Sequence, residues 1–112
     1  QLSGPYEFFG MCQCSRCRKA TGAAFATNLF VKANQFKWLT GESEVGEYVM
    51  EAPNTFGNAF CKTCGSRAPR FSSARGWMMA PLGSTMQTPE IEPTLVCAKD
   101  HTDWFKKLEE MI

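Results

Sequence analysis

The stretch CQCSRC at residues 12–17 places three cysteines within six positions, and CKTCG at residues 61–65 adds a second closely spaced pair. Thiolates are soft donors that bind Zn²⁺ at tetrahedral angles, and a C-x-x-C turn brings two sulfurs to one ion. The glycine that follows Cys64 fits such a turn, which often needs a positive φ. The spacing therefore predicts zinc-binding knuckles, each at the end of a strand.

Short strands separated by Gly, Ser and Pro turns account for most of the remaining sequence. Aromatic and aliphatic runs predict strands at 6–11, 25–31, 35–39, 45–50, 56–60, 67–71, 77–82 and 94–97. Residues 15–20 fit one helical turn that Thr21-Gly22 ends. Near the end of the chain the period changes, because Trp104, Leu108 and Met111 share one side of a helix that we expect to cover a sheet. The predicted class is mainly β with a short C-terminal helix.

Composition limits the other classes. The 112 residues are 44% hydrophobic and 12% aromatic, enough for one modest core, so we expect a single domain over residues 1–112. A net charge of +1 gives no long-range field that would gather nucleic acid or an anionic membrane. No apolar run approaches the ~18 residues that span a bilayer, and the first residues lack the order of a signal peptide. These features favour a cytoplasmic protein without a membrane or nucleic-acid partner, and they leave its oligomeric state open.

Spacing alone leaves two arrangements of the metal open. One structural zinc held by Cys14, Cys17, Cys61 and Cys64, as in a zinc ribbon, leaves Cys12 over. Alternatively Cys12, Cys14 and Cys17 share one ion with a vacant fourth position, which describes a catalytic zinc. A disulfide scaffold explains the cysteines less well, because such short rings restrict little unfolded-chain entropy.

Other polar and sulfur-containing side chains carry weaker signals. Three cations surround the first knuckle, where they could lower thiolate pKa values or pair with substrate carboxylates. We take Arg16 as the substrate-binding candidate and expect Arg18 and Lys19 to be solvated. Cys97 is predicted to be a buried small hydrophobe, and His101, the only histidine, a surface or capping residue.

Taken together and in order, these motifs resemble the glutathione-dependent formaldehyde-activating enzyme family, which includes centromere protein V. The resemblance spans nearly the whole chain and rests on CQCSRCRKATG at 12–22, Phe25-Ala26, FCKTCGS at 60–66, LGS at 82–84 and Trp104. It implies a β-tent fold of small packed antiparallel sheets, with zinc as the cofactor.

The resemblance also implies roles for single residues. Cys12, Cys14 and Cys17 match the family's proposed catalytic zinc site, and Cys61 and Cys64 match half of a four-cysteine structural site. The implied activity is that of a carbon–sulfur lyase, which joins formaldehyde to glutathione, or a related thiol, as S-(hydroxymethyl)glutathione. The alternative is a non-enzymatic binding module in which zinc only staples strands together.

This chain departs from the family pattern at two places. The upstream C-x-C pair of the structural site is absent, so we expect residues 1–112 to lack the strand and cysteine pair that precede this domain. We therefore also expect Cys61 and Cys64 to bind metal more weakly than the first cluster. Gln13 stands where family members often carry a histidine, and an amide cannot replace a histidine in proton transfer.

Overall fold

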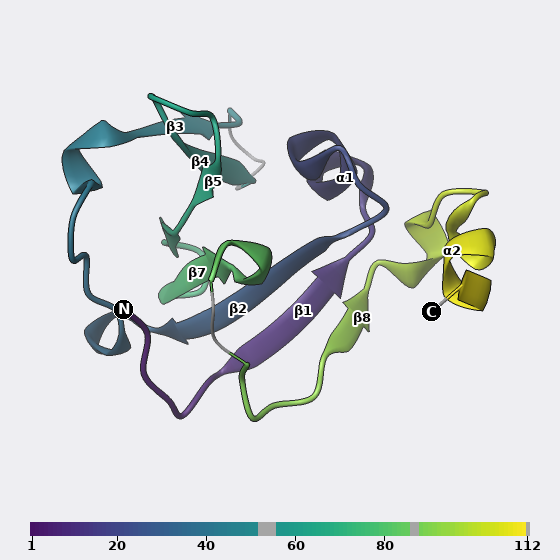
Figure 1. Cartoon of the computed structure of the whole chain (residues 1–112), viewed down its shortest axis with the longest axis horizontal. Coiled ribbons are helices and arrows are strands. Elements are labelled where there is room, and N and C mark those ends of the chain that lie inside the picture. Colours follow the sequence, from purple (N-terminus) through teal and green to yellow (C-terminus); the bar gives the residue numbers. More distant parts are fainter. Residues whose placement is uncertain (52–55, 86–87, 112) are drawn as a thin grey trace.

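The strands form two sheets, and the chain passes from the larger to the smaller after residue 32 and returns at Pro69. The computed structural model describes residues 1–51, 56–85 and 88–111. Its larger sheet has the order β6-β7-β2-β1-β8 and its smaller sheet the order β3-β4-β5 (Figure 1). The strands of the larger sheet are β1 (Phe8–Cys12), β2 (Ala26–Lys32), β6 (Arg70–Ser72), β7 (Trp77–Pro81) and β8 (Thr94–Val96). Those of the smaller sheet are β3 (Val45–Val49), β4 (Gly57–Cys61) and β5 (Arg67–Ala68).

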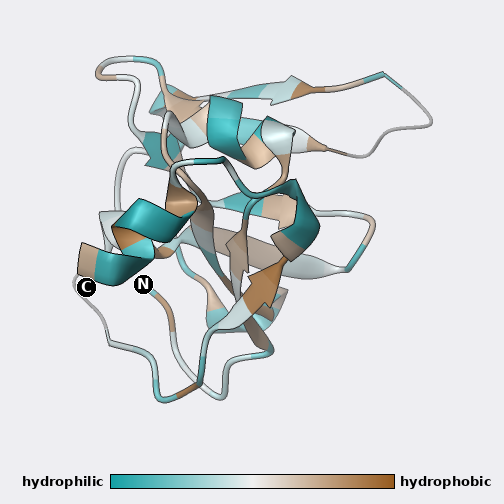
Figure 2. Cartoon of the chain, turned by 90° about the vertical axis from the view of Figure 1, so that its right-hand side faces the viewer, coloured by the Kyte–Doolittle hydropathy of each residue, from teal (hydrophilic) through white to brown (hydrophobic). Residues whose placement is uncertain are grey.

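The two faces of the larger sheet serve different purposes, because successive strand residues point to opposite sides. One face carries the hydrophobic core, formed by Leu2, Leu29, Val31, Met78 and Ala80. In Figure 2 hydrophobic colours run along several strands, and some of the connecting segments are brown as well. The residues between these core positions face the other way, which leaves the second face free to build a site.

The prediction of a mainly β fold with small sheets and a C-terminal helix is confirmed. Not every pair is antiparallel, since β8 runs parallel to β1. The strand predicted at 67–71 is two strands of different sheets, β5 and β6, separated by Pro69. Proline lacks the N–H that a continuous ladder needs, which explains the break.

The strand predicted at 35–39 is wrong. Residues Ala33–Gln35 form a 3₁₀ turn, and Phe36 makes only an isolated bridge to Leu2. The Gln35 side chain accepts a hydrogen bond from the Lys32 N–H at 2.8 Å and donates to the Pro5 carbonyl. This amide fixes a turn where the apolar pattern alone indicates a strand. Further 3₁₀ turns lie at Glu42–Glu44, Leu82–Ser84 and Ala98–Asp100.

Two helices flank the sheets. Helix α1 (Ser15–Thr21) ends at Gly22, whose φ of 67° is the left-handed value that the predicted stop requires. Helix α2 (Phe105–Met111) lies beyond the end of β8 (Figure 1). Its predicted apolar face does not cover a sheet: Met111 is 82% exposed, and only Phe105 is buried, edge-on against the Phe25 ring. No helix among the described residues has the length and apolarity to cross a membrane.

Candidate metal centre

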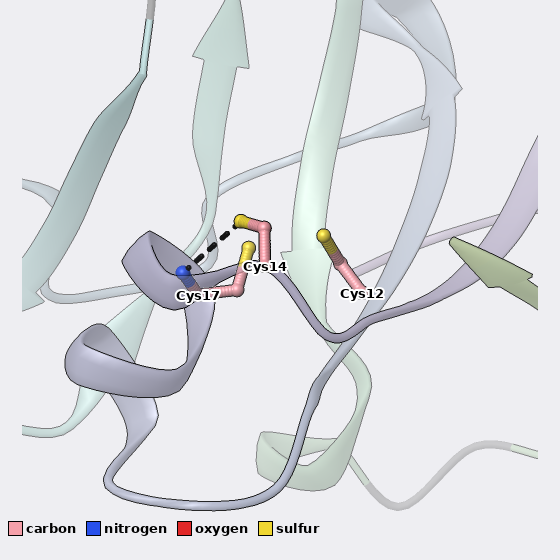
Figure 3. Close-up of side chains that lie close together, drawn as sticks. All are labelled: Cys12, Cys14 and Cys17. Carbon is pink, nitrogen blue, oxygen red and sulfur yellow. Dashed lines mark hydrogen bonds between the residues drawn. The ribbon is translucent and has the colours of Figure 1, made fainter. Parts of the chain in front are cut away.

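Three cysteines meet where β1 turns into α1. Cys12 ends β1, Cys14 is the N-cap of α1, and Cys17 lies in the first turn of that helix. The Cys17 backbone N–H donates to the Cys14 sulfur at 3.4 Å, which fixes the turn between them (Figure 3). All three sulfurs lie within 4.8 Å of one another. A tetrahedral zinc holds its sulfurs about 3.8 Å apart, so small side-chain rotations bring this cluster to ligand geometry.

The three neighbouring thiols need a nearby cation if all of them are to be ionised. Burial raises the pKa of Cys12 and of Cys17, and the neighbouring sulfurs raise that of Cys17 further. Burial also acts on Cys14, but hydrogen bonds from Cys17 and other neighbours outweigh it and lower the Cys14 pKa. Three thiolates so close together repel one another unless a positive ion compensates them. The donor set of three soft sulfurs therefore fits Zn²⁺.

The cluster opens into a cavity of about 360 Å³ between the two sheets. The larger sheet contributes the face opposite the hydrophobic core, including Phe8, Asn28 and Phe30. The smaller sheet contributes Gly57, where an added Cβ would collide with the Arg70 guanidinium. A glycine at this position thus lets the Arg70 side chain pass into the cavity.

Three arginines line the same cavity and make it positive. Arg70 is paired with Glu47 at 3.2 Å. Arg75 lies over the Phe30 ring, 5.2 Å from its centre, and Arg67 donates to the Asn58 side-chain oxygen at 2.9 Å. Burial lowers the Arg67 pKa, and the charge of Cys17 opposes that shift. Neither Arg67 nor Arg75 forms an ion pair with a carboxylate of the described residues.

The other cysteine pair lies apart from the cluster. Cys61 ends β4, and Cys64 is exposed in the turn that follows, where its thiol donates to the Ser66 hydroxyl at 3.2 Å. Within the described part of the chain, Cys61 and Cys64 belong to no group of three candidate metal ligands. The ribbon arrangement, with Cys14 and Cys17 joined to this pair, is therefore not formed.

The remaining predicted residues are distributed outside the cavity. Arg16 is exposed and lines a different hollow, together with Tyr48 and Phe56. His101 is exposed and ends the 3₁₀ turn Ala98–Asp100, as predicted for a surface or capping residue. The prediction that Cys97 is buried is wrong: it is exposed, with a left-handed φ of 54°, because the chain turns outward after β8.

Gln13 points away from its two cysteine neighbours. Its side chain is fully buried and does not line the cavity that Cys12 and Cys14 line. Neither polar atom of the amide has a hydrogen-bond partner among the described residues. Gln13 is therefore not one of the side chains that line the cavity of the cysteine cluster.

Sequence reasoning missed the arginines and Asn28. A signal existed for Asn28, because it is the one amide in the otherwise hydrophobic and β-branched run ATNLFV at residues 26–31. A polar residue at such a position indicates a special role for that face. No comparable signal marks Arg67, Arg70 or Arg75, which come together only when the chain crosses from one sheet to the other.

Comparisons with known proteins place the chain in a family. Neither the curated proteins nor the solved structures gave a match. The model of the family described as glutathione-dependent formaldehyde-activating enzyme matches residues 2–101. This match covers most of the 112 residues and agrees with the cysteine cluster. The chain therefore belongs to the glutathione-dependent formaldehyde-activating enzyme family.

Proposed function

We propose that this protein is a zinc-dependent carbon–sulfur lyase that forms and cleaves the adduct of formaldehyde with glutathione or a closely related thiol. One observation carries the proposal: the cluster of Cys12, Cys14 and Cys17 opens into a cavity that arginines line. A thiol-containing dicarboxylate needs both a place for its sulfur and cations for its carboxylates. Family membership supports glutathione and formaldehyde as the two reactants.

Cys12, Cys14 and Cys17 would hold the zinc as three thiolate ligands. Held there, the ion would supply a Lewis acid with a vacant fourth position, which would lower the pKa of a substrate thiol. In the same cavity, Arg67 and Arg75 can each offer a guanidinium fork to a carboxylate. The arginines would thus orient the substrate, with its sulfur at the metal position that the cysteine cluster defines.

The apolar walls of the cavity support the chemistry. The ring centres of Phe8 and Phe30 lie 5.9 Å apart in the cavity wall. These rings would reduce the access of water to the sulfur of the bound substrate. In the forming direction, the thiolate attacks the carbonyl carbon, the π electrons move to oxygen, and the oxygen takes a proton from solvent water. In the cleaving direction, the same bonds change in reverse.

The zinc-loaded protein is expected to accelerate this exchange. We expect nuclear magnetic resonance exchange spectroscopy on ¹³C-formaldehyde and glutathione to show an interconversion rate at least roughly tenfold above buffer, the scale of modest acid–base or metal assistance. Protein stripped of metal by a chelator serves as the control and should lose the gain. A zinc-loaded protein that gives only the uncatalysed rate would instead support a non-enzymatic binding module.

A further inference from the structure

Asn28 is a buried amide on the cavity face of β2. Its side chain is 6% exposed and lines the cavity of the cysteine cluster. Its Oδ1 atom has no hydrogen-bond partner in the part of the chain that the structure describes. The next residue, Leu29, is fully buried in the core on the other face. Asn28 is therefore a polar group placed in a position that an apolar residue would fill equally well.

Such a placement has a thermodynamic cost. A buried carbonyl oxygen without a hydrogen bond loses its hydration and gains nothing in return. Val or Thr would suit the extended backbone of β2 better than Asn, which is depleted in strands. Residues that violate these preferences concentrate at functional sites, where a ligand uses the group. The unpartnered oxygen inside a cavity thus points to a ligand that carries a hydrogen-bond donor.

The register places Asn28 close to the cysteine cluster. Cys12 pairs with Ala26 across the β1–β2 ladder, and Asn28 pairs with Gly10. Asn28 is consequently the diagonal neighbour of Cys12 on the same face of the sheet. Diagonal neighbours on antiparallel strands lie about 7–8 Å apart, so both side chains can contact one ligand in the cavity that they line. Gly10 has no side chain, and the Phe8 ring and a methyl group of Val96 lie over its Cα.

We propose that Asn28 is a further catalytic residue of the proposed reaction: its Oδ1 accepts a hydrogen bond from the hydroxyl of the one-carbon unit. The inference rests on the proposed function. In cleavage, the C–S bond breaks with its electron pair going to sulfur, which leaves as thiolate, the C=O bond forms, and the hydroxyl proton passes to solvent water. The acceptor at Asn28 orients that hydroxyl and polarises its O–H bond. The amide itself neither gains nor loses a proton.

The test compares Asn28→Val with Asn28→Thr, two side chains of nearly equal shape of which only Thr keeps an acceptor. We expect the Val variant to lose roughly 10- to 100-fold in exchange rate, the scale of one hydrogen bond to a group that becomes charged, and the Thr variant to keep most of the rate. Zinc content and the Kd of glutathione, measured by calorimetry, should stay within threefold of the parent in both. The metal-free Val variant should melt at a higher temperature than the metal-free parent, because the unsatisfied oxygen is gone.

Several outcomes would overturn the inference. An active parent whose Val variant keeps the full rate rules out the role of Asn28 alone and leaves the proposed function intact. Loss of zinc or of the folded state in both variants would make Asn28 a structural residue. A parent without exchange activity overturns the proposed function and the role of Asn28 together, which the parent assay reveals on its own.

Discussion

Replacing Cys14 with serine is expected to remove zinc from the cluster and to lower the formaldehyde–glutathione exchange rate by at least ~100-fold, because a neutral hydroxyl is a poor substitute for a thiolate ligand. Most of the fold should persist. Cys14 is the N-cap of α1 and accepts the Cys17 N–H, a role that serine fills well. The hydrophobic core around Leu29 and Val31 lies on the opposite face of the sheet. Atomic emission measures the zinc content, circular dichroism the fold, and exchange spectroscopy the rate.

Cys97→Ser is the matched control for this variant. Cys97 is exposed and lies outside the cavity, so its loss should change neither the zinc content nor the exchange rate. A globally unfolded Cys14→Ser protein would show that the zinc is structural. A folded Cys14→Ser protein with the parental rate would show that the cluster is not the catalyst.

The double substitution of Arg67 and Arg75 by glutamine is expected to raise the KM of glutathione by roughly 100-fold, with kcat changed only a few-fold. Hydrogen bonds to charged groups contribute about 1.5–3 kcal/mol each, so the loss of two carboxylate contacts is large enough for this effect. Because the carboxylates of glutathione take no part in the bond changes, contacts to them stabilise the bound substrate and the transition state alike. Steady-state kinetics as a function of glutathione concentration measures the shift.

Two controls test whether the carboxylates of glutathione bind at Arg67 and Arg75. Arg16→Gln should leave the KM unchanged, because Arg16 is exposed and lines a different hollow. Glutathione diethyl ester, which lacks both carboxylates, should bind equally weakly to the parent and to the double variant. If Arg16→Gln raised the KM and the double variant did not, the substrate would bind on the outer side of α1 instead.

The parts of this protein that the sequence predicts well are local. Three cysteines within six residues can be brought together by a single strand-to-helix turn, so their cluster requires no knowledge of distant contacts. Most strands show the apolar runs that their half-buried faces require. The strand predicted at 35–39 failed because one side-chain amide, that of Gln35, stabilises a turn against the apolar pattern.

The parts that the sequence does not reveal depend on how the two sheets meet. Arg67 and Arg70 stand on either side of Pro69, in different sheets, and their side chains converge only because the chain crosses there. Arg75 joins them from a turn that carries no periodic signal. The burial of Gln13 likewise follows from the alternation of side chains through the knuckle, which spacing between cysteines does not describe.

X-ray absorption at the zinc edge tests the central claim most directly, namely that Cys12, Cys14 and Cys17 hold one zinc whose fourth position accepts the substrate thiol. The sample is the zinc-loaded double variant Cys61→Ser, Cys64→Ser, which removes the other cysteine pair. The predicted spectrum shows three sulfurs at ~2.3 Å and one lighter ligand before glutathione is added, and four sulfurs afterwards. A spectrum that glutathione leaves unchanged, or a variant that binds no zinc at all, would contradict the claim.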